Sequence, residues 1–286
     1  MTDRKHVVVT GSSGKIGREA VRALKAAGHR VVGFDLKPGT SDGLRTAAVD
    51  CSDFGEVMGA LSGIDTMGGT PDAVVHLAGI PAPGLASDAR TFDVNTVSTY
   101  NVFSACAKLG IGRIAWGSSE TILGLPFGTP PAFLPLDETH PDMPNWSYAL
   151  AKFLGEQMAD QFVRWHPALT IVSLQFSNVF DAADYALQPA VAVKPAIRKF
   201  NLWGYVDARD AGDACRLAIE ADLTGHERMI IAAADNIAGH AATDLAAAHF
   251  PDSPVRGALD KDQSLLSSAR ATRLIGYRPQ HSWRDS

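Results

Sequence analysis

Residues Val7–Gly17 read VVVTGSSGKIG. The segment starts with β-branched residues typical of a buried strand, passes through glycines at 11, 14 and 17, and leads into a helix-like run at 18–27. This order suits the pyrophosphate of a dinucleotide, because a glycine turn lets the backbone approach phosphates and a helix N-terminus offers free N–H groups. A strand–turn–helix corner without a ligand has the same pattern, so the segment alone gives a hypothesis.

The composition limits the class of protein. The chain has 286 residues, 46% of them hydrophobic, which is enough for one large domain or a domain with a smaller lobe. Its net charge is −5 without a basic run, so we expect no nucleic-acid partner. We find neither a signal peptide nor an apolar run of membrane-spanning length, and we expect no membrane partner.

The cysteines and histidines predict no special chemistry. Cys51, Cys106 and Cys215 are odd in number and far apart, as expected of core thiols in a reducing compartment. We therefore expect a cytoplasmic protein without disulfides. The nine histidines have no metal-ligand spacing, and we predict no metal site.

Strand-like and helix-like segments alternate along the chain. Strands are predicted at 31–34, 46–49, 73–77, 113–116, 170–176 and 228–232, and helices at 53–61, 88–109, 147–165, 209–221 and 263–275. This alternation predicts an α/β protein with a Rossmann-type, doubly wound parallel sheet. Residues 1–178, with 205–233 returning to them, would form the NAD-binding domain. Residues 179–204 and 234–286 would form a small substrate-binding lobe.

An acidic residue follows the second predicted strand. Asp35 lies 18 residues after Gly17, where a Rossmann unit places a carboxylate on the adenosine ribose. A carboxylate there repels a 2′-phosphate and favours NAD over NADP, although Lys37 weakens that preference. The alternative is that Asp35 only begins a turn.

Tyr148 and Lys152 are four residues apart near the start of a predicted helix, so both lie on one face. A tyrosine hydroxyl has a pKa near 10 and is a poor base at neutral pH, but a neighbouring ammonium stabilises the phenolate. Such a tyrosine takes a proton from a substrate hydroxyl as hydride leaves the same carbon. The alternative is a chance pair in which Lys152 bonds Glu156.

Ser118 and Ser119 follow the fifth predicted strand at the edge where parallel sheets bind ligands. A hydroxyl there can orient a reacting substrate oxygen toward Tyr148. Two serines in a loop are also ordinary turn residues.

Together these motifs resemble the extended short-chain dehydrogenase/reductases, the branch called NAD-dependent epimerases/dehydratases. The matching segments are TGSSGKIG at 10–17, Asp35, HLAG at 76–79, SS at 118–119, YALAK at 148–152, SNVF at 177–180, YVDARD at 205–210 and IGYRPQHSW at 275–283. The resemblance implies a Rossmann fold, NAD as cofactor, a carbohydrate substrate and a homodimer formed through helices 88–109 and 147–165.

The resemblance also implies roles for individual residues. Tyr148 would be the catalytic acid/base, Lys152 would lower its pKa and hold the nicotinamide ribose, and Ser119 is the better match to the catalytic serine. The cofactor would contact Gly11, Ser13, Gly14, Lys15, Ile16, Gly17, Asp35, Asp50, Cys51, Leu77, Ala78, Gly79, Asn95, Tyr148 and Lys152. The substrate would contact Ser118, Ser119, Glu120, Thr121 and Asn178.

Departures from the family pattern narrow the activity. Thr121 stands where family dehydratases carry the glutamate that removes a proton, which disfavours dehydration. Asn201 stands near the usual arginine that clamps a nucleotide diphosphate, although Arg198 or Lys199 could substitute. The segment 178–203 is also short for this family. A smaller pocket suits a free sugar or sugar acid, as in the compact uronate dehydrogenases.

Arg209 is then a candidate partner for a substrate carboxylate, although an ion pair with Asp213 is favoured. The preferred interpretation is an NAD-dependent oxidoreductase that transfers hydride from a carbohydrate hydroxyl to NAD. The alternatives are a nucleotide-sugar epimerase with tightly bound NAD and a non-catalytic NAD-binding sensor or scaffold.

Overall fold

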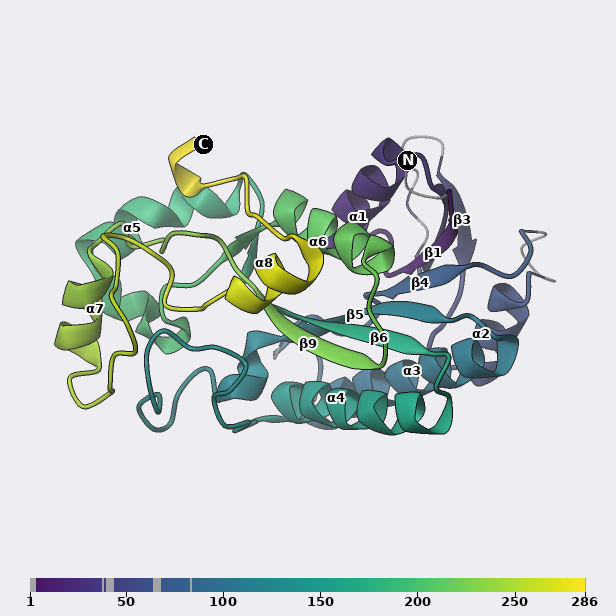
Figure 1. The fold of residues 1–286 in the computed structure, drawn as a ribbon, viewed down its shortest axis with the longest axis horizontal. Coiled ribbons are helices and arrows are strands. Elements are labelled where there is room, and N and C mark those ends of the chain that lie inside the picture. The colour runs from purple at the N-terminus through teal and green to yellow at the C-terminus, as the bar shows by residue number, and fades with distance from the viewer. Residues whose placement is uncertain (1–3, 38, 40–43, 64–67, 83, 286) are drawn as a thin grey trace.

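The computed structural model describes residues 4–37, 39, 44–63, 68–82 and 84–285. Its centre is a parallel sheet of seven strands in the order β3-β2-β1-β4-β5-β6-β9 (Figure 1). The strands are β1 His6–Thr10, β2 Arg30–Asp35, β3 Arg45–Ala48, β4 Ala73–His76, β5 Arg113–Ser119, β6 Thr170–Phe176 and β9 His226–Ile231. The order reverses beside β1, as in a doubly wound sheet, which confirms the predicted fold class.

Helices cover both faces of this sheet (Figure 1). One layer contains α1 Lys15–Ala26, α6 Ala208–Glu220 and α8 Ala269–Ile275, packed over one apolar cluster. The other contains α2 Phe54–Leu61, α3 Asp88–Leu109 and α4 Ser147–Trp165, packed over a second cluster. The central strands β4 and β6 are buried along their whole length because both faces are covered.

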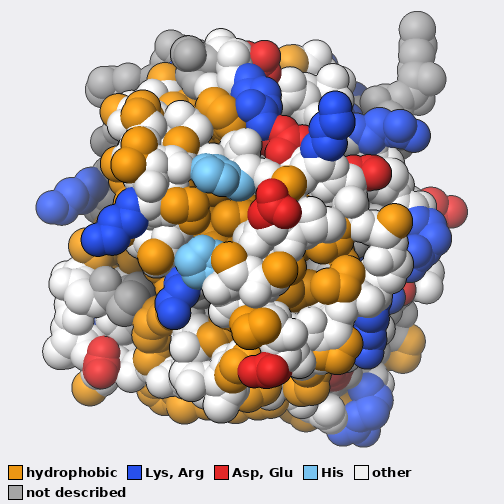
Figure 2. Space-filling view, turned by 90° about the vertical axis from the view of Figure 1, so that its left-hand side faces the viewer, with side chains coloured by type: hydrophobic (Ala, Val, Ile, Leu, Met, Phe, Trp, Pro, Cys, Tyr) orange, Lys and Arg blue, Asp and Glu red, His pale blue; other side chains and the backbone are white. Residues whose placement is uncertain are grey.

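A third apolar cluster lies outside the sheet. It includes Leu134, Trp203, Tyr205 and Phe250. Its residues come from the segments 180–205 and 230–266 and from the loop 123–136. The local elements are β7 Val179–Phe180 paired with β8 Val206–Asp207, α5 Gln188–Val193 and α7 Ala242–His249. We call this region the lobe. Figure 2 views the molecule from the lobe side and shows charges of both signs scattered among hydrophobic side chains.

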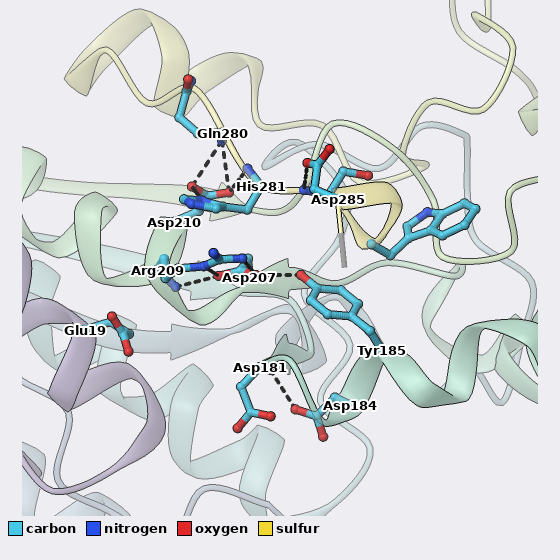
Figure 3. Close-up of polar contacts among 12 residues, drawn as sticks. Glu19, Asp181, Asp184, Tyr185, Asp207, Arg209, Asp210, Gln280, His281 and Asp285 are labelled. Carbon is cyan, nitrogen blue, oxygen red and sulfur yellow. Dashed lines mark hydrogen bonds and ion pairs between the residues drawn. The ribbon is translucent and has the colours of Figure 1, made fainter.

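Acidic side chains tie the chain's end and the lobe to α6 (Figure 3). The buried carboxylate of Asp210 accepts hydrogen bonds from the backbone N–H groups of Gln280 and His281 and pairs with the His281 ring. The buried Asp207 carboxylate accepts from the Tyr185 hydroxyl at 2.7 Å and from the Arg209 guanidinium at 2.8 Å. The expected Arg209–Asp213 pair was wrong, because Asp207 caps the start of α6 within direct reach of Arg209.

One prediction about the tail was wrong, and one helix there was missed. The last helix begins at Ala269 rather than near Gln263, because the residues before it bond to other loops: Ser264 N–H donates to Ala234 and Ser267 N–H to Leu136. The alanine-rich helix α7 was not predicted. Among the described residues, no helix combines the length and the apolarity needed to cross a bilayer.

Candidate active site

A cavity of about 900 Å³ opens beyond the carboxyl ends of β1, β4, β5 and β6. It brings together residues that are up to about 190 positions apart in the chain, from Gly11 to Asn201. The predicted residues on its wall are Gly11, Ser13, Gly14, Lys15, Ile16, Gly17, Asp35, Asp50, Cys51, Leu77, Ala78, Gly79, Ser118, Ser119, Glu120, Thr121, Tyr148, Lys152 and Asn178.

The glycine turn between β1 and α1 has the shape of a phosphate cradle. Gly11 has a φ of +66°, and a Cβ there would lie 2.8 Å from the Ala78 nitrogen. A Cβ on Gly17 would lie 2.1 Å from the Gly11 oxygen, whereas one on Gly14 would meet only that oxygen, at 3.2 Å. No side chain caps the first turn of α1, so its N–H groups remain available to an anion. These residues fit the pyrophosphate of NAD.

Asp35 is held in place by backbone N–H groups. Its two carboxylate oxygens accept from Ser13 N–H at 3.0 Å and Lys37 N–H at 3.1 Å. This links the end of β2 to the glycine turn on the cavity wall. Nearby, burial raises the pKa of the Cys51 thiol to about 12, so this cysteine is an apolar wall residue rather than a nucleophile.

Asn95 is not on the described cavity wall. Its amide bonds both backbone groups of Ile80, accepting from N–H at 2.7 Å and donating to the carbonyl at 3.0 Å. From α3, the Asn95 side chain therefore fixes the position of the loop that follows β4, which contains Gly79 and Ile80. A Cβ on Gly79 would lie 2.8 Å from the Asn95 oxygen, so the two residues fit each other closely.

Tyr148 lies beside Ser119 at the start of α4. Burial raises the pKa of Tyr148 to about 12, with a further increase from Glu120, while the hydrogen bond with Ser119 acts in the opposite direction. The Ser119 hydroxyl oxygen also accepts from Thr121 N–H at 3.2 Å and the Thr121 hydroxyl at 3.0 Å. Thr121 therefore orients the serine that faces the tyrosine.

Lys152 lies one turn along α4 from Tyr148. Its ammonium donates to the Gly117 carbonyl at 2.6 Å and lies 5.8 Å from the centre of the Tyr148 ring. Burial lowers the pKa of Lys152 to about 8, and the charge of Glu156 offsets part of that shift. The ammonium is thus held beside the tyrosine ring without a direct bond to a carboxylate of the described residues.

The two serines face different partners. The Ser118 hydroxyl donates to Glu156 at 2.6 Å, and this buried glutamate also accepts from Gln175 at 3.0 Å. Ser118 thus connects β5 with α4, whereas Ser119 is the serine beside Tyr148. Sequence spacing could not separate them, because the difference depends on how α4 packs on β5.

The structure adds further residues to the cavity wall, and three of them lie near the predicted substrate residues. They are Ser177, Phe200 and Asn201, which come from the turn after β6 and from the lobe. Arg198 is buried behind this wall, where it donates to the Asn178 side chain at 2.9 Å and lies about 5 Å from the rings of Phe180 and Phe200. Lys199 is exposed. Neither cation lines the described cavity wall.

Lys15 connects the glycine turn with the lobe. Its ammonium forms ion pairs with Asp181, at 3.3 Å, and with Asp184. It also donates to the Val179 carbonyl at 3.4 Å. Figure 3 shows both aspartates, with the Asp184 carboxylate accepting from the Asp181 N–H.

The chain matches known proteins over most of its length. It is 26% identical to an L-arabinose 1-dehydrogenase (NAD(P)(+)) of Haloferax volcanii, over 96% of each chain. It is also 26% identical to a UDP-glucose 4-epimerase of Neisseria meningitidis serogroup C, over 75% of this chain but 64% of the relative.

Solved structures show the same fold. A short-chain dehydrogenase/reductase superfamily protein from Agrobacterium tumefaciens with bound NAD superimposes with a TM-score of 0.70 at 24% identity, covering 98% of this chain and 94% of the other. The model of the NAD dependent epimerase/dehydratase family matches residues 7–233, which confirms the resemblance seen in the motifs. The chain therefore belongs to the NAD-dependent epimerase/dehydratase family and is an NAD-using enzyme of that family.

Proposed function

We propose that the chain is a dehydrogenase that transfers hydride from a hydroxyl-bearing carbon of a free sugar or sugar acid to NAD. The observation that carries this proposal is the joining, in one cavity, of the glycine turn with Tyr148, Ser119 and Lys152. The residues at the two ends of the cavity match the two halves of such a reaction, cofactor binding and proton removal.

Bound NAD supplies the hydride acceptor. Ser119 hydrogen-bonds the substrate hydroxyl and directs it at Tyr148, whose phenolate oxygen takes the proton as hydride leaves the same carbon. Burial opposes the phenolate, so the Lys152 ammonium beneath the ring has to stabilise it. The roles of Gly11, Gly14 and Gly17 at the pyrophosphate and of Asp35 at the ribose complete the proposed cofactor site.

The wall of the cavity favours a dehydrogenase over a nucleotide-sugar epimerase. A nucleotide diphosphate needs cationic donors, and Arg198 is used behind the wall by Asn178 and the Gly204 carbonyl. The similarity to the Haloferax dehydrogenase over 96% of both chains also supports this choice. The epimerase is the second candidate, supported by relatives of that activity.

The decisive experiment mixes the protein with NAD⁺ and a possible substrate and follows NADH absorbance. One panel of substrates contains free aldoses and uronic acids, and the other contains nucleotide sugars. Steady NADH formation with a free sugar supports the dehydrogenase. Epimer formation from a nucleotide sugar without net NADH supports the epimerase. NAD binding without turnover in both panels supports the sensor or scaffold.

Tyr148→Phe tests the proposed base directly. We expect kcat to fall by about 10²–10⁴-fold, because the variant cannot take the substrate proton, while NAD binding, followed by protein fluorescence, is unchanged. The exposed Tyr100→Phe variant on α3 is the matched control and should keep full activity. Turnover retained in Tyr148→Phe would remove Tyr148 from the mechanism.

We also propose that the protein is a homodimer and that it is located in the cytoplasm. The outer faces of α3 and α4 expose Val97, Tyr100, Leu150 and Trp165, which supports a homodimer formed through these helices. Light scattering after size-exclusion chromatography measures the mass. The three cysteines are buried and free, which supports the reducing cytoplasm. Fractionation of the source cells tests the location.

A further inference from the structure

Besides the Ser177 hydroxyl, two buried acceptor oxygens of the cavity wall have no hydrogen-bond partner among the described residues. They are Oε2 of Glu120, a residue that is 5% exposed, and Oδ1 of Asn201, a residue that is 2% exposed. The two side chains touch, since the Asn201 amide donates to Oε1 of Glu120 at 3.4 Å and to the Gly204 carbonyl at 2.9 Å. A buried acceptor without a donor is costly, which points to donors supplied by a bound molecule.

Glu120 lies next to the proposed chemistry. It follows Ser119 directly, and its charge acts on Tyr148. Burial raises the pKa of Glu120 to about 7, while Ser177, Arg198, Asn201 and the Asn178 backbone favour the charged form. Oε2 accepts no hydrogen bond of normal distance and angle from the described residues, although the Ser177 hydroxyl, which also has no partner, lies close enough to lower this pKa. Above neutral pH this carboxylate accepts hydrogen bonds and donates none.

Two of the three cations near this pair are bonded to other groups, and the third, Arg198, lies behind the wall with its buried Nε unpartnered among the described residues. Lys15 is paired with Asp181 and Asp184, and Lys152 donates to the Gly117 carbonyl. Arg198 lies behind the wall and donates to Asn178. A carboxylate brought to this end by a substrate would meet two acceptors, because Lys15 and Lys152 are bonded to other groups and Arg198 lies behind the wall.

We propose that Glu120 and Asn201 form a subsite that accepts hydrogen bonds from two hydroxyl groups of a neutral sugar and rejects sugar acids. This inference rests on the proposed dehydrogenase function and restricts its substrate to uncharged aldoses. Each hydroxyl donates to one of the two unpartnered oxygens. Selectivity then comes from the loss of donors and the added repulsion when a carboxylate replaces a hydroxymethyl group.

The test compares matched substrates that differ only at the last carbon, D-galactose with D-galacturonate and D-glucose with D-glucuronate, with L-arabinose and D-xylose as pentoses. Initial NADH rates at pH 8 give kcat/KM for each. We expect the kcat/KM of at least one neutral hexose to exceed that of its own uronate by tenfold or more. If a pentose is the best substrate, its kcat/KM should exceed that of both uronates by the same factor. A uronate turned over as well as or better than the aldoses overturns the subsite and leaves the dehydrogenase standing.

Glu120→Gln distinguishes a change in sugar recognition from a general loss of activity. Glutamine keeps the size but replaces one acceptor with an amide donor, so KM for the neutral aldose should rise at least tenfold and the aldose-to-uronate ratio should fall at least tenfold. The half-buried Glu138→Gln, outside the cavity, is the control and should leave that ratio unchanged. A ratio unchanged in Glu120→Gln overturns the inference.

The two proposals fail in different ways. If no free sugar gives NADH but a nucleotide sugar is epimerised, the proposed function fails and the subsite is overturned with it. If neither panel reacts, both are overturned. The wild-type comparison requires no variant, so the subsite can be judged even if Glu120→Gln does not fold.

Discussion

At the scale of single residues, the site depends on charges that are buried close to one another. Glu120, Tyr148 and Lys152 all have pKa values moved toward the neutral form, with burial as the largest cause in each case. Such shifts are typical of active sites, where the folded chain holds groups that water would otherwise stabilise as ions. The cost of that arrangement can be measured at Glu120.

Glu120→Gln should stabilise the protein in a pH-dependent way. The carboxyl has a folded pKa of about 7, raised from 4.5, so below pH 4.5 both states are protonated and its ionisation costs nothing. As pH rises to 7, the unfolded chain ionises first and wild-type stability falls by about 3 kcal/mol in total. Urea unfolding from pH 4 to 8.5 should show that the free energy of unfolding of Glu120→Gln exceeds that of the wild type by this amount at the high end of the range. The exposed Asp93→Asn variant should show no such pH-dependent difference. A pH-independent difference would contradict the assigned cause.

At the scale of elements, the close approach of α4 to β5 positions the proposed catalytic residues. Gly155 of α4 faces Trp116 of β5, and a Cβ there would lie 2.3 Å from the indole ring. The same helix carries Tyr148 and Lys152, and it sends Glu156 to Ser118 on β5. A small residue at 155 therefore sets the distance between the two halves of the active site.

Gly155→Ala should move α4 away from the sheet. We expect a loss of about 1–3 kcal/mol in the free energy of unfolding from overpacking, together with a lower kcat because Tyr148 and Ser119 separate. Urea denaturation and NADH kinetics measure the two effects. Gln157→Ala, exposed on the same helix, is the control. Full activity in Gly155→Ala would mean that the helix spacing tolerates a methyl group.

At the scale of the whole molecule, the sheet domain and the lobe share the cavity, and the polar ties between them hold it together. Lys15 reaches from the glycine turn to Asp181 and Asp184 in the lobe. The C-terminal tail returns over α6 through Asp210, and Trp283 N–H then donates to the Tyr205 hydroxyl in the lobe. The tail therefore links the lobe to the sheet.

Asp210→Ala should loosen this link. The variant leaves two backbone N–H groups and the His281 ring without their acceptor, so we expect a loss of about 3–5 kcal/mol in the free energy of unfolding. Asp285→Asn, at an exposed carboxylate of the same tail, should change it by less than about 1 kcal/mol. Urea unfolding and limited proteolysis of the tail measure the outcome, and a stable Asp210→Ala would show that the tail is held by its apolar contacts alone.

The sequence by itself determined the parallel sheet and about half of the residues that line the cavity. Apolar β-branched runs, glycines at 11, 14 and 17 and helical periods are local patterns, and parallel strands place their ends at one edge. Asp35, the serine pair at 118–119, Tyr148 and Lys152 could therefore be placed at one edge of the sheet before any distance was known, and the family resemblance implied their roles. The helices 88–109 and 147–165 were predicted with the bounds that α3 and α4 have.

Only the tertiary structure decided which serine faces Tyr148, that Asn95 holds Ile80, and that Arg198 lies behind the cavity wall and bonds Asn178. It also brought Asn201 to Glu120 across 81 positions of the chain. No local pattern encodes such contacts, because they depend on how α4 packs on β5 and how the lobe folds over the sheet. Motifs thus specify where chemistry can occur, whereas long-range packing determines the partner and charge of each group.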